Sequence, residues 1–137
     1  FAAIDLPYDP PQAAAADAAT LARARQLVTQ GDPVRRLPAC ASCHGERLTG
    51  VQPAVPSLLG LPRDYLNAQL GAWRTGTRSA RAPDCMAEVT RRLAPEDIGA
   101  LSAWLAAQPV PTPAGAAAAL PRALPLRCGG EPATIAP

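Results

Sequence analysis

Cys40-Ala41-Ser42-Cys43-His44 is the stretch of this 137-residue chain that most constrains its fold. Two thiols spaced three positions apart can add to the two vinyl groups on one edge of a porphyrin, and the next residue then lies beneath the iron. His44, the sole histidine of the chain, stands at that position and can bind iron through an imidazole nitrogen. The spacing therefore predicts one covalent c-type haem with His44 as its first axial ligand.

Three other interpretations are compatible with the spacing of the cysteine pair. A thioredoxin-like redox pair needs a βαβ context, whereas the residues before Cys40 indicate a helix and a turn. A zinc site needs further ligands, and the remaining cysteines, Cys85 and Cys128, are isolated in the sequence. A simple disulfide between Cys40 and Cys43 is the third alternative. Haem attachment is the interpretation that also accounts for the adjacent histidine.

Met86, the sole methionine, is the candidate for the second axial ligand. A thioether is a soft ligand that favours ferrous iron and commonly pairs with histidine in electron carriers. It stands at the end of a predicted loop over residues 77–86, where a chain returning across the far face of a haem would pass. The alternative is a side chain that fills a gap in the core, but polar residues such as Asp84 and Glu88 flank it.

Three segments have the apolar spacing, capping residues and terminators of helices. Asp17 caps the first helix, which runs to about Thr29. Pro62 is expected as the first residue of the second helix, which Gly76 ends. The third helix begins at the run starting with Pro95 and stops before residue 109. No strand pattern occurs, so the sequence predicts an all-α fold in which long loops, residues 45–61 and 77–86, wrap around one covalent haem.

Proline content divides the chain into three segments. Residues 1–16 are predicted to be an extended arm, residues 17–108 the haem domain, and residues 109–137 a proline-rich tail. The tail needs an anchor, and Cys128 can supply it by pairing with Cys85. Two cysteines left over in an exported protein usually form a disulfide, with free thiols or intermolecular bonds as alternatives.

Composition restricts the class of protein. A formal net charge of +2 is too small to indicate nucleic acid as a partner. No stretch reaches the roughly 18 to 20 apolar residues of a membrane helix, so no membrane span is expected. The chain does not open on a signal peptide. Because thioethers to haem form outside the cytoplasm, we expect a periplasmic protein whose signal peptide has been removed.

On these residues the chain resembles the class I c-type cytochromes, close to the cytochrome c4 and c553 type. The resemblance covers about half of the chain, from Leu37 to Ala107. The motifs that carry it are Pro38-Ala39-Cys40-Ala41-Ser42-Cys43-His44-Gly45, Pro56-Ser57-Leu58-Leu59-Gly60, Tyr65-Leu66-Asn67-Ala68-Gln69-Leu70, Trp73, Gly76-Thr77-Arg78, Met86 and Leu93-Ala94-Pro95-Glu96-Asp97-Ile98.

The resemblance also implies roles for individual residues. Pro56 should offer its carbonyl group to the second ring nitrogen of His44 and so orient the ring. Tyr65, Trp73 and Arg78 become candidates to line the haem or to hold a propionate, since an arginine fork suits a carboxylate. The plainer alternatives are that Pro56 is a loop breaker and that the other three belong to the core or the surface.

The function implied by the resemblance is single-haem electron transfer and not enzymatic catalysis, because two firm axial ligands leave no open position on iron. The expected partners are redox proteins: a dehydrogenase as donor and an oxidase or another cytochrome as acceptor. In an alternative hypothesis the arm and tail wrap a partner, making a stable hetero-oligomer. The chain is then the permanent electron-accepting subunit of a periplasmic dehydrogenase complex. In a further hypothesis Met86 dissociates, and the protein is an enzyme or a ligand sensor.

Overall fold

The computed structural model describes residues 10–14 and 16–129. These residues contain five helices: α1 (Ala18–Thr29), α2 (Cys40–His44), α3 (Arg63–Thr75), α4 (Cys85–Arg92) and α5 (Pro95–Ala107). No strand occurs in this part of the chain, where the only sheet-like pairings are three isolated bridges between loop residues. The predicted all-α architecture is confirmed.

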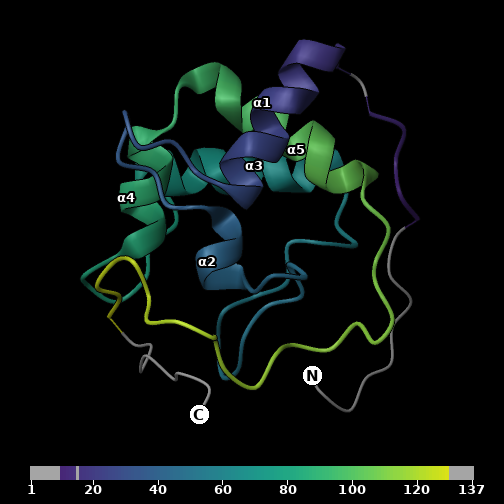
Figure 1. Ribbon diagram of the computed structural model, residues 1–137. Helices are drawn as coiled ribbons and strands as arrows, with labels where there is room; N and C mark the ends of the chain where they lie inside the picture. The colour runs from purple at the N-terminus through teal and green to yellow at the C-terminus, as the bar shows by residue number, and fades with distance from the viewer. Residues whose placement is uncertain (1–9, 15, 130–137) are drawn as a thin grey trace.

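Helix α5 is the centre of the packing. It contacts α1 on one side and α3 on another, and α3 in turn contacts α4 (Figure 1). The core between these helices is aliphatic; Ala24, Leu27 and Val28 of α1 are almost completely buried with Leu101 and Leu105 of α5. Within the described residues no helix is both long and apolar enough to cross a bilayer.

The three predicted helices are present with small differences at their ends. Asp17 caps α1 by accepting a hydrogen bond of 2.8 Å from the backbone of the first turn. Pro62 is the cap that precedes α3 and not its first helical residue, and Gly76 ends α3 in a left-handed conformation with φ of 82°. Pro95 is the first residue of α5, which ends two residues before Pro109.

Helix α4 is an element that the sequence patterns did not indicate. Its first turn contains Cys85 and Met86, so the prediction that residues 77–86 form a loop is wrong at its last two positions. Asp84 caps the helix by accepting a hydrogen bond of 3.1 Å from the N–H of Ala87. Eight residues span little more than two turns, which is too short for a clear apolar period to emerge.

The tail is attached to the loop between α2 and α3. It runs from the end of α5 along the lower side of the molecule and returns to α4 (Figure 1). The N–H of Gln52 donates to the carbonyl of Ala117 at 2.8 Å, and the N–H of Ala117 donates to the carbonyl of Gly50 at 2.9 Å. Leu120, three residues after Ala117 in the tail, is buried. The described part of the tail is therefore fastened to the body although it has no helix.

The end of the arm is also fastened to the helices. The N–H of Gln12 donates to the carbonyl of Ala106 at 2.8 Å, and the Gln12 side chain accepts a hydrogen bond of 2.7 Å from the N–H of Arg63. Gln12 thereby satisfies a free backbone donor at the start of α3. The predicted extended arm lies outside the described residues over positions 1–9 and 15.

One ion network holds α1, α5 and the connection between α1 and α2 together. Arg23 of α1 contacts Asp32 at 2.8 Å and Asp97 of α5 at 3.3 Å. The Asp97 carboxylate, which is 4% exposed, also accepts a hydrogen bond of 3.0 Å from the N–H of Ala94 at the start of α5. The hydrogen bond from Arg23 lowers the pKa of the Asp32 carboxyl group. Asp97 therefore joins a helix cap to an interhelical ion pair.

Asp97→Asn should destabilise the fold, because it removes the negative charge opposite Arg23 and weakens the cap at Ala94. We expect the free energy of unfolding at pH 7 to fall by about 2 kcal/mol in guanidinium denaturation. The matched control is Glu96→Gln, an exposed acid in the same helical turn, whose effect should stay within about 0.5 kcal/mol. Equal losses in the two variants would show a general effect of acids at the helix start and contradict a role for the network.

Candidate haem-binding site

Helix α2 consists of the five residues Cys40–His44. The side chains of Cys40 and Cys43 lie on the same side of the helix because residues three apart are neighbours on a helical surface. Both are partly buried and neither forms a disulfide. Burial raises the pKa of Cys40 to about 11 and also raises the pKa of Cys43, so both are neutral thiols at neutral pH.

The ring of His44 is held in one orientation. Its Nδ1 atom lies 2.8 Å from the carbonyl oxygen of Pro56. Because a carbonyl can only accept, Nδ1 carries the proton and donates the hydrogen bond, and Nε2 keeps a free lone pair. The burial of the ring lowers the pKa of His44, a shift that the hydrogen bond to Pro56 partly opposes. His44 is therefore neutral at pH 7 and can act as a ligand through Nε2.

The Nε2 atom has the surroundings expected of an iron ligand. It has no hydrogen-bond partner among the described residues. In that part of the chain no completely buried side-chain nitrogen or oxygen lacks a partner, so Nε2 is not completely buried. An oriented, neutral imidazole next to two free thiols is a donor set that fits a covalent haem.

The loop after α2 places the Pro56 carbonyl. The N–H of Gly50 donates to the carbonyl of His44 at 2.9 Å, and the N–H of Leu58 donates to the carbonyl of Leu48 at 2.9 Å. Pro56 lies in the sequence between Gly50 and Leu58, whose backbone hydrogen bonds hold the loop, so its carbonyl has little freedom to move away from the imidazole. The hydrogen bond that the resemblance implied is present.

Gly50 is a residue of this site that sequence reasoning treated only as part of a loop. Its φ of 89° is strained for other residues, and a Cβ atom there would lie 2.8 Å from the carbonyl carbon of Pro56 and 2.9 Å from the nitrogen of Ser57. The loop can therefore close over His44 only with glycine at this position. The sequence feature that could have indicated this role is the position of Gly50, six residues after His44 and among prolines and further glycines.

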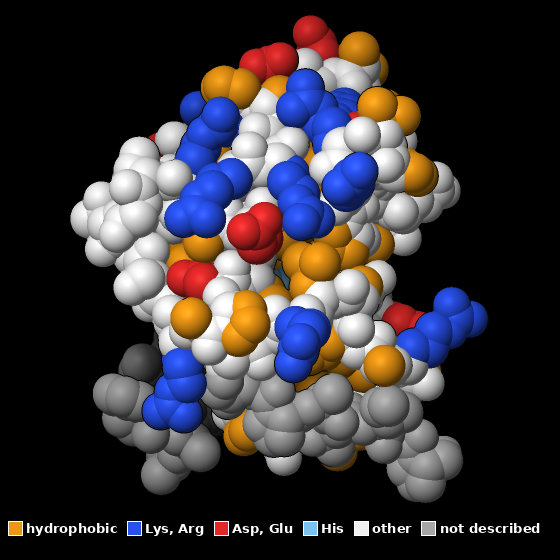
Figure 2. All heavy atoms as spheres, turned by 90° about the vertical axis from the view of Figure 1, so that its left-hand side faces the viewer, with side chains coloured by type: hydrophobic (Ala, Val, Ile, Leu, Met, Phe, Trp, Pro, Cys, Tyr) orange, Lys and Arg blue, Asp and Glu red, His pale blue; other side chains and the backbone are white. Residues whose placement is uncertain are grey.

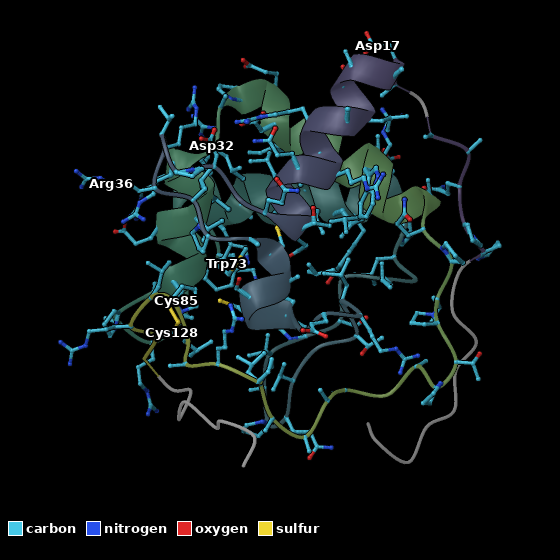
Figure 3. All side chains as sticks on the ribbon, viewed as in Figure 1. Asp17, Asp32, Arg36, Trp73, Cys85 and Cys128 are labelled. Carbon is cyan, nitrogen blue, oxygen red and sulfur yellow. A yellow bond between two sulfur atoms is a disulfide. The ribbon has the colours of Figure 1, made fainter. Side chains whose placement is uncertain are left out.

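The candidate second ligand lies on helix α4. Met86 is partly buried in the first turn of α4, and its carbonyl accepts a hydrogen bond of 2.8 Å from the hydroxyl group of Thr90. Cys85, the preceding residue, forms a disulfide with Cys128 in the tail (Figure 3). The predicted pairing of these cysteines is confirmed. It attaches the tail directly beside Met86, whose ligation of iron stays a prediction.

The remaining candidate residues lie on or just after α3. The guanidinium group of Arg78 lies 5.1 Å from the centre of the Trp73 ring, a cation–π contact, and also donates a hydrogen bond to the Gln69 side chain. Tyr65, near the other end of the helix, is 47% exposed. The structure thus brings Trp73 and Arg78 together and leaves Tyr65 apart from them, while their contact with a haem stays a prediction.

The other interpretations of the cysteine pair find no support in the described residues. No group of three or more histidine, cysteine or acidic side chains is arranged there to hold a metal ion, as a zinc site requires. That part of the chain has no strand from which a thioredoxin-like βαβ unit could be built. Cys40 and Cys43 are not bonded to each other.

The chain is similar in sequence to known proteins. Residues 21–109 match the family described as cytochrome c. A curated relative, the thiosulfate dehydrogenase electron acceptor of Thiomonas intermedia (strain K12), is 37% identical over 92 residues, which are 67% of this chain and 42% of that protein. The chain spans about two fifths of the length of the curated relatives it matches.

Two solved structures are similar to the described fold. The thiosulfate dehydrogenase of Marichromatium purpuratum matches with a TM-score of 0.65 and 38% identity, over 74% of this chain and 21% of that one. Cytochrome c4 of Pseudomonas stutzeri matches with a TM-score of 0.58 and 30% identity, over 70% of this chain and 52% of that one.

Gly50→Ala should disturb the candidate site, because the added methyl group displaces Pro56 from His44. We expect the purified holoprotein to lose about 2 kcal/mol of unfolding free energy. Its reduction potential should rise, because the hydrogen bond makes the imidazole a stronger donor. Gly115→Ala is the matched control, since no atom lies within 4 Å of the added methyl group. An unchanged potential in Gly50→Ala would show that the loop does not orient His44.

Proposed function

The chain belongs to the cytochrome c family, and from this premise we propose that it is a one-haem electron-transfer domain that accepts electrons from a thiosulfate-oxidising dehydrogenase in the periplasm. The chain has one Cys-x-x-Cys-His motif, one histidine and one methionine, which supports a single haem with His44 and Met86 as axial ligands. The observation that carries the proposal is the hydrogen bond of 2.8 Å between His44 and Pro56.

Each residue of the proposed site has a separate task. Cys40 and Cys43 would form the thioether bonds to the haem, and His44 and Met86 would bind its iron. The bound haem supplies a one-electron couple between ferric and ferrous iron. The Pro56 carbonyl keeps the proton on Nδ1 of His44, so that Nε2 stays available as a donor in both oxidation states. A ligand that does not reorient suits electron transfer.

The identity of the donor rests on the names of similar proteins. The curated relatives are electron acceptors of thiosulfate dehydrogenase, and the structure with 38% identity is itself a thiosulfate dehydrogenase. These names favour the hypothesis of an electron-accepting subunit or domain over that of a carrier with many partners. A transient or a permanent complex with the dehydrogenase would serve the same transfer.

The proposal predicts that thiosulfate, together with a purified thiosulfate dehydrogenase, reduces the ferric protein. A reduced-minus-oxidised visible spectrum follows the reaction, and a pyridine haemochrome assay should count one haem per chain. Thiosulfate without the dehydrogenase is the control and should leave the protein oxidised. Reduction by dithionite but not by the complete mixture would contradict the proposed donor, and two haems per chain would contradict the proposed count.

A second prediction concerns the disulfide beside Met86. We propose that the Cys85–Cys128 bond restrains the first turn of α4 and so keeps the thioether on iron. The double variant Cys85→Ser/Cys128→Ser should lose the methionine-to-iron charge-transfer band at a lower guanidinium concentration than the wild type, while the Soret band persists. Met86→Ala is the reference for complete loss of the band. A double variant that keeps the band up to the wild-type concentration would show that the disulfide secures only the tail.

A further inference from the structure

A short turn projects from the molecule just before α2. Its residues 33–36, called the docking turn below, are closed by two backbone hydrogen bonds of 2.9 Å between Asp32 and Leu37. Val34, in the middle of the turn, is 94% exposed. Arg36 lies at the outer edge of the molecule, on the side where α4 is found (Figure 3). The turn therefore presents an apolar side chain next to a cationic one.

The docking turn is fixed from its base. Asp32 accepts a hydrogen bond of 3.0 Å from the N–H of Val34, and the same carboxylate is held by Arg23 of α1 at 2.8 Å. Within the turn, the N–H of Arg36 donates to the carbonyl of Pro33 at 3.1 Å. These contacts tie the turn to α1 and restrict the directions in which Val34 can point.

Helix α4 holds the turn from the other side. The guanidinium group of Arg92 donates to the carbonyl of Arg36 at 2.7 Å, and that of Arg35 donates to the carbonyl of Arg92 at 3.2 Å. A surface loop with an exposed valine at its tip would lower its exposed apolar area if it could fold back. The ties to α1 and α4 prevent this, so the exposure of Val34 is built into the fold.

Backbone strain distinguishes Arg36 from an ordinary surface residue. Only two described non-glycine residues have a left-handed conformation, Arg36 with φ of 55° and Leu48 with φ of 62°. Leu48 is buried in the hydrophobic core, so packing of its side chain accounts for its strain. Arg36 is exposed and gains no such packing, although glycine would adopt this conformation without strain. The strain at Arg36 therefore points to a role for its side chain outside the fold.

The surface around the docking turn is cationic. Arg92 of α4 contacts Arg35 and Arg36, and Arg91 precedes it in the helix. The acid that pairs with Arg91 and Arg92 is Glu88, at 3.8 Å from Arg91 and 3.3 Å from Arg92. Figure 2 faces this side of the molecule and shows basic side chains gathered above a small hollow, which hydrophobic and acidic side chains border. One carboxylate cannot balance four guanidinium groups.

The basic surface is separated by only a few residues from two residues of the proposed haem site, one in the chain before α2 and one in α4. Cys40 follows Arg36 by four residues. Arg92 follows Met86 by six residues in the same helix, which is about 9 Å along the helix axis. A protein bound to the docking turn would thus lie near the site that exchanges electrons.

We propose that Val34, Arg35, Arg36 and Arg91 form the surface that docks the electron-donating protein, and that the complementary surface of this donor is an apolar depression rimmed by carboxylates. The identity of the donor, though not the surface, rests on the function proposed above. Cationic side chains guide an acidic partner to this face, and the fixed valine sets the position in which it binds. An exposed strained arginine and an exposed fixed valine are both explained by this role.

Stopped-flow reduction of the ferric holoprotein by a thiosulfate dehydrogenase and thiosulfate tests the proposal. Arg36→Gly removes the charge and the strain but keeps the carbonyl that Arg92 binds. It should lower the second-order rate constant at low ionic strength by about fivefold, with a melting temperature equal to or above that of the wild type. Val34→Asp should lower the rate constant by about tenfold. Added salt should reduce the difference between Arg36→Gly and the wild type.

Arg122→Gln is the matched control, an exposed arginine of the tail whose loss should change the rate constant by less than about twofold. Unchanged rate constants in Arg36→Gly and Val34→Asp would overturn the proposal. A lower melting temperature of Arg36→Gly would also overturn it, because the side chain would then serve the fold. Binding to phosphatidylglycerol vesicles that Val34→Asp abolishes, with unchanged rates of reduction, would assign the surface to a membrane instead.

If the wild type accepts no electrons from the dehydrogenase, the proposed donor is wrong, and an electrode then tests the surface separately. The probe is gold coated with a mixed layer of carboxylate-terminated and methyl-terminated thiols. Interfacial electron transfer should be faster for the wild type than for Val34→Asp and Arg36→Gly, and equal for Arg122→Gln. Equal rates for all four proteins on this electrode would overturn the docking surface itself.

Discussion

The site depends on one hydrogen bond, from Nδ1 of His44 to the carbonyl of Pro56. It decides which ring nitrogen keeps a lone pair and in which direction that lone pair points. The bond forms only because Gly50 lets two segments of the loop after α2 come close together. The tail supports the same loop by pairing Ala117 with Gly50 and Gln52. Residues far apart in the sequence thus cooperate to orient one imidazole.

The tail links the two sides of the proposed site. It pairs with the loop that orients His44 and then, through Cys128, bonds covalently to the helix that bears Met86. The match to the cytochrome c family ends at residue 109, so this connection lies outside the shared part. In a chain with only 4% aromatic residues, such ties add restraints that a small aliphatic core does not supply.

Asp32 joins the fold to the proposed docking surface. Its carboxylate binds Arg23, which also holds the start of α5 through Asp97, and it accepts a hydrogen bond from the N–H of Val34. The same ion network that positions α1 against α5 therefore also fixes the turn that presents Val34. A surface that is rigid before binding loses less conformational entropy when a partner docks.

Local signals predicted much of the fold. Asp17, Pro62, Gly76 and Pro95 mark helix ends because capping and the exclusion of proline act within a few residues. Helix α4 escaped prediction because eight residues carry too weak a period. Asp84, which caps α4, was included in the loop predicted over residues 77–86. The ion network around Arg23 was not predicted, because the two carboxylates that Arg23 contacts lie 9 and 74 positions away in the sequence.

The sequence by itself was enough to predict the chemistry of the site. The spacing of Cys40, Cys43 and His44 predicts covalent haem with His44 as one ligand, because attachment through two thioethers needs neighbouring residues. The sole methionine, Met86, adds a candidate for the second ligand. Only the tertiary structure decided how these groups are held and presented. The resemblance implied the contact of Pro56 with His44, and the structure supplied its geometry. The contacts of the tail with the loop, and of α4 with the docking turn, join segments distant in sequence. Such contacts follow from packing in three dimensions, and no local pattern of residues encodes them.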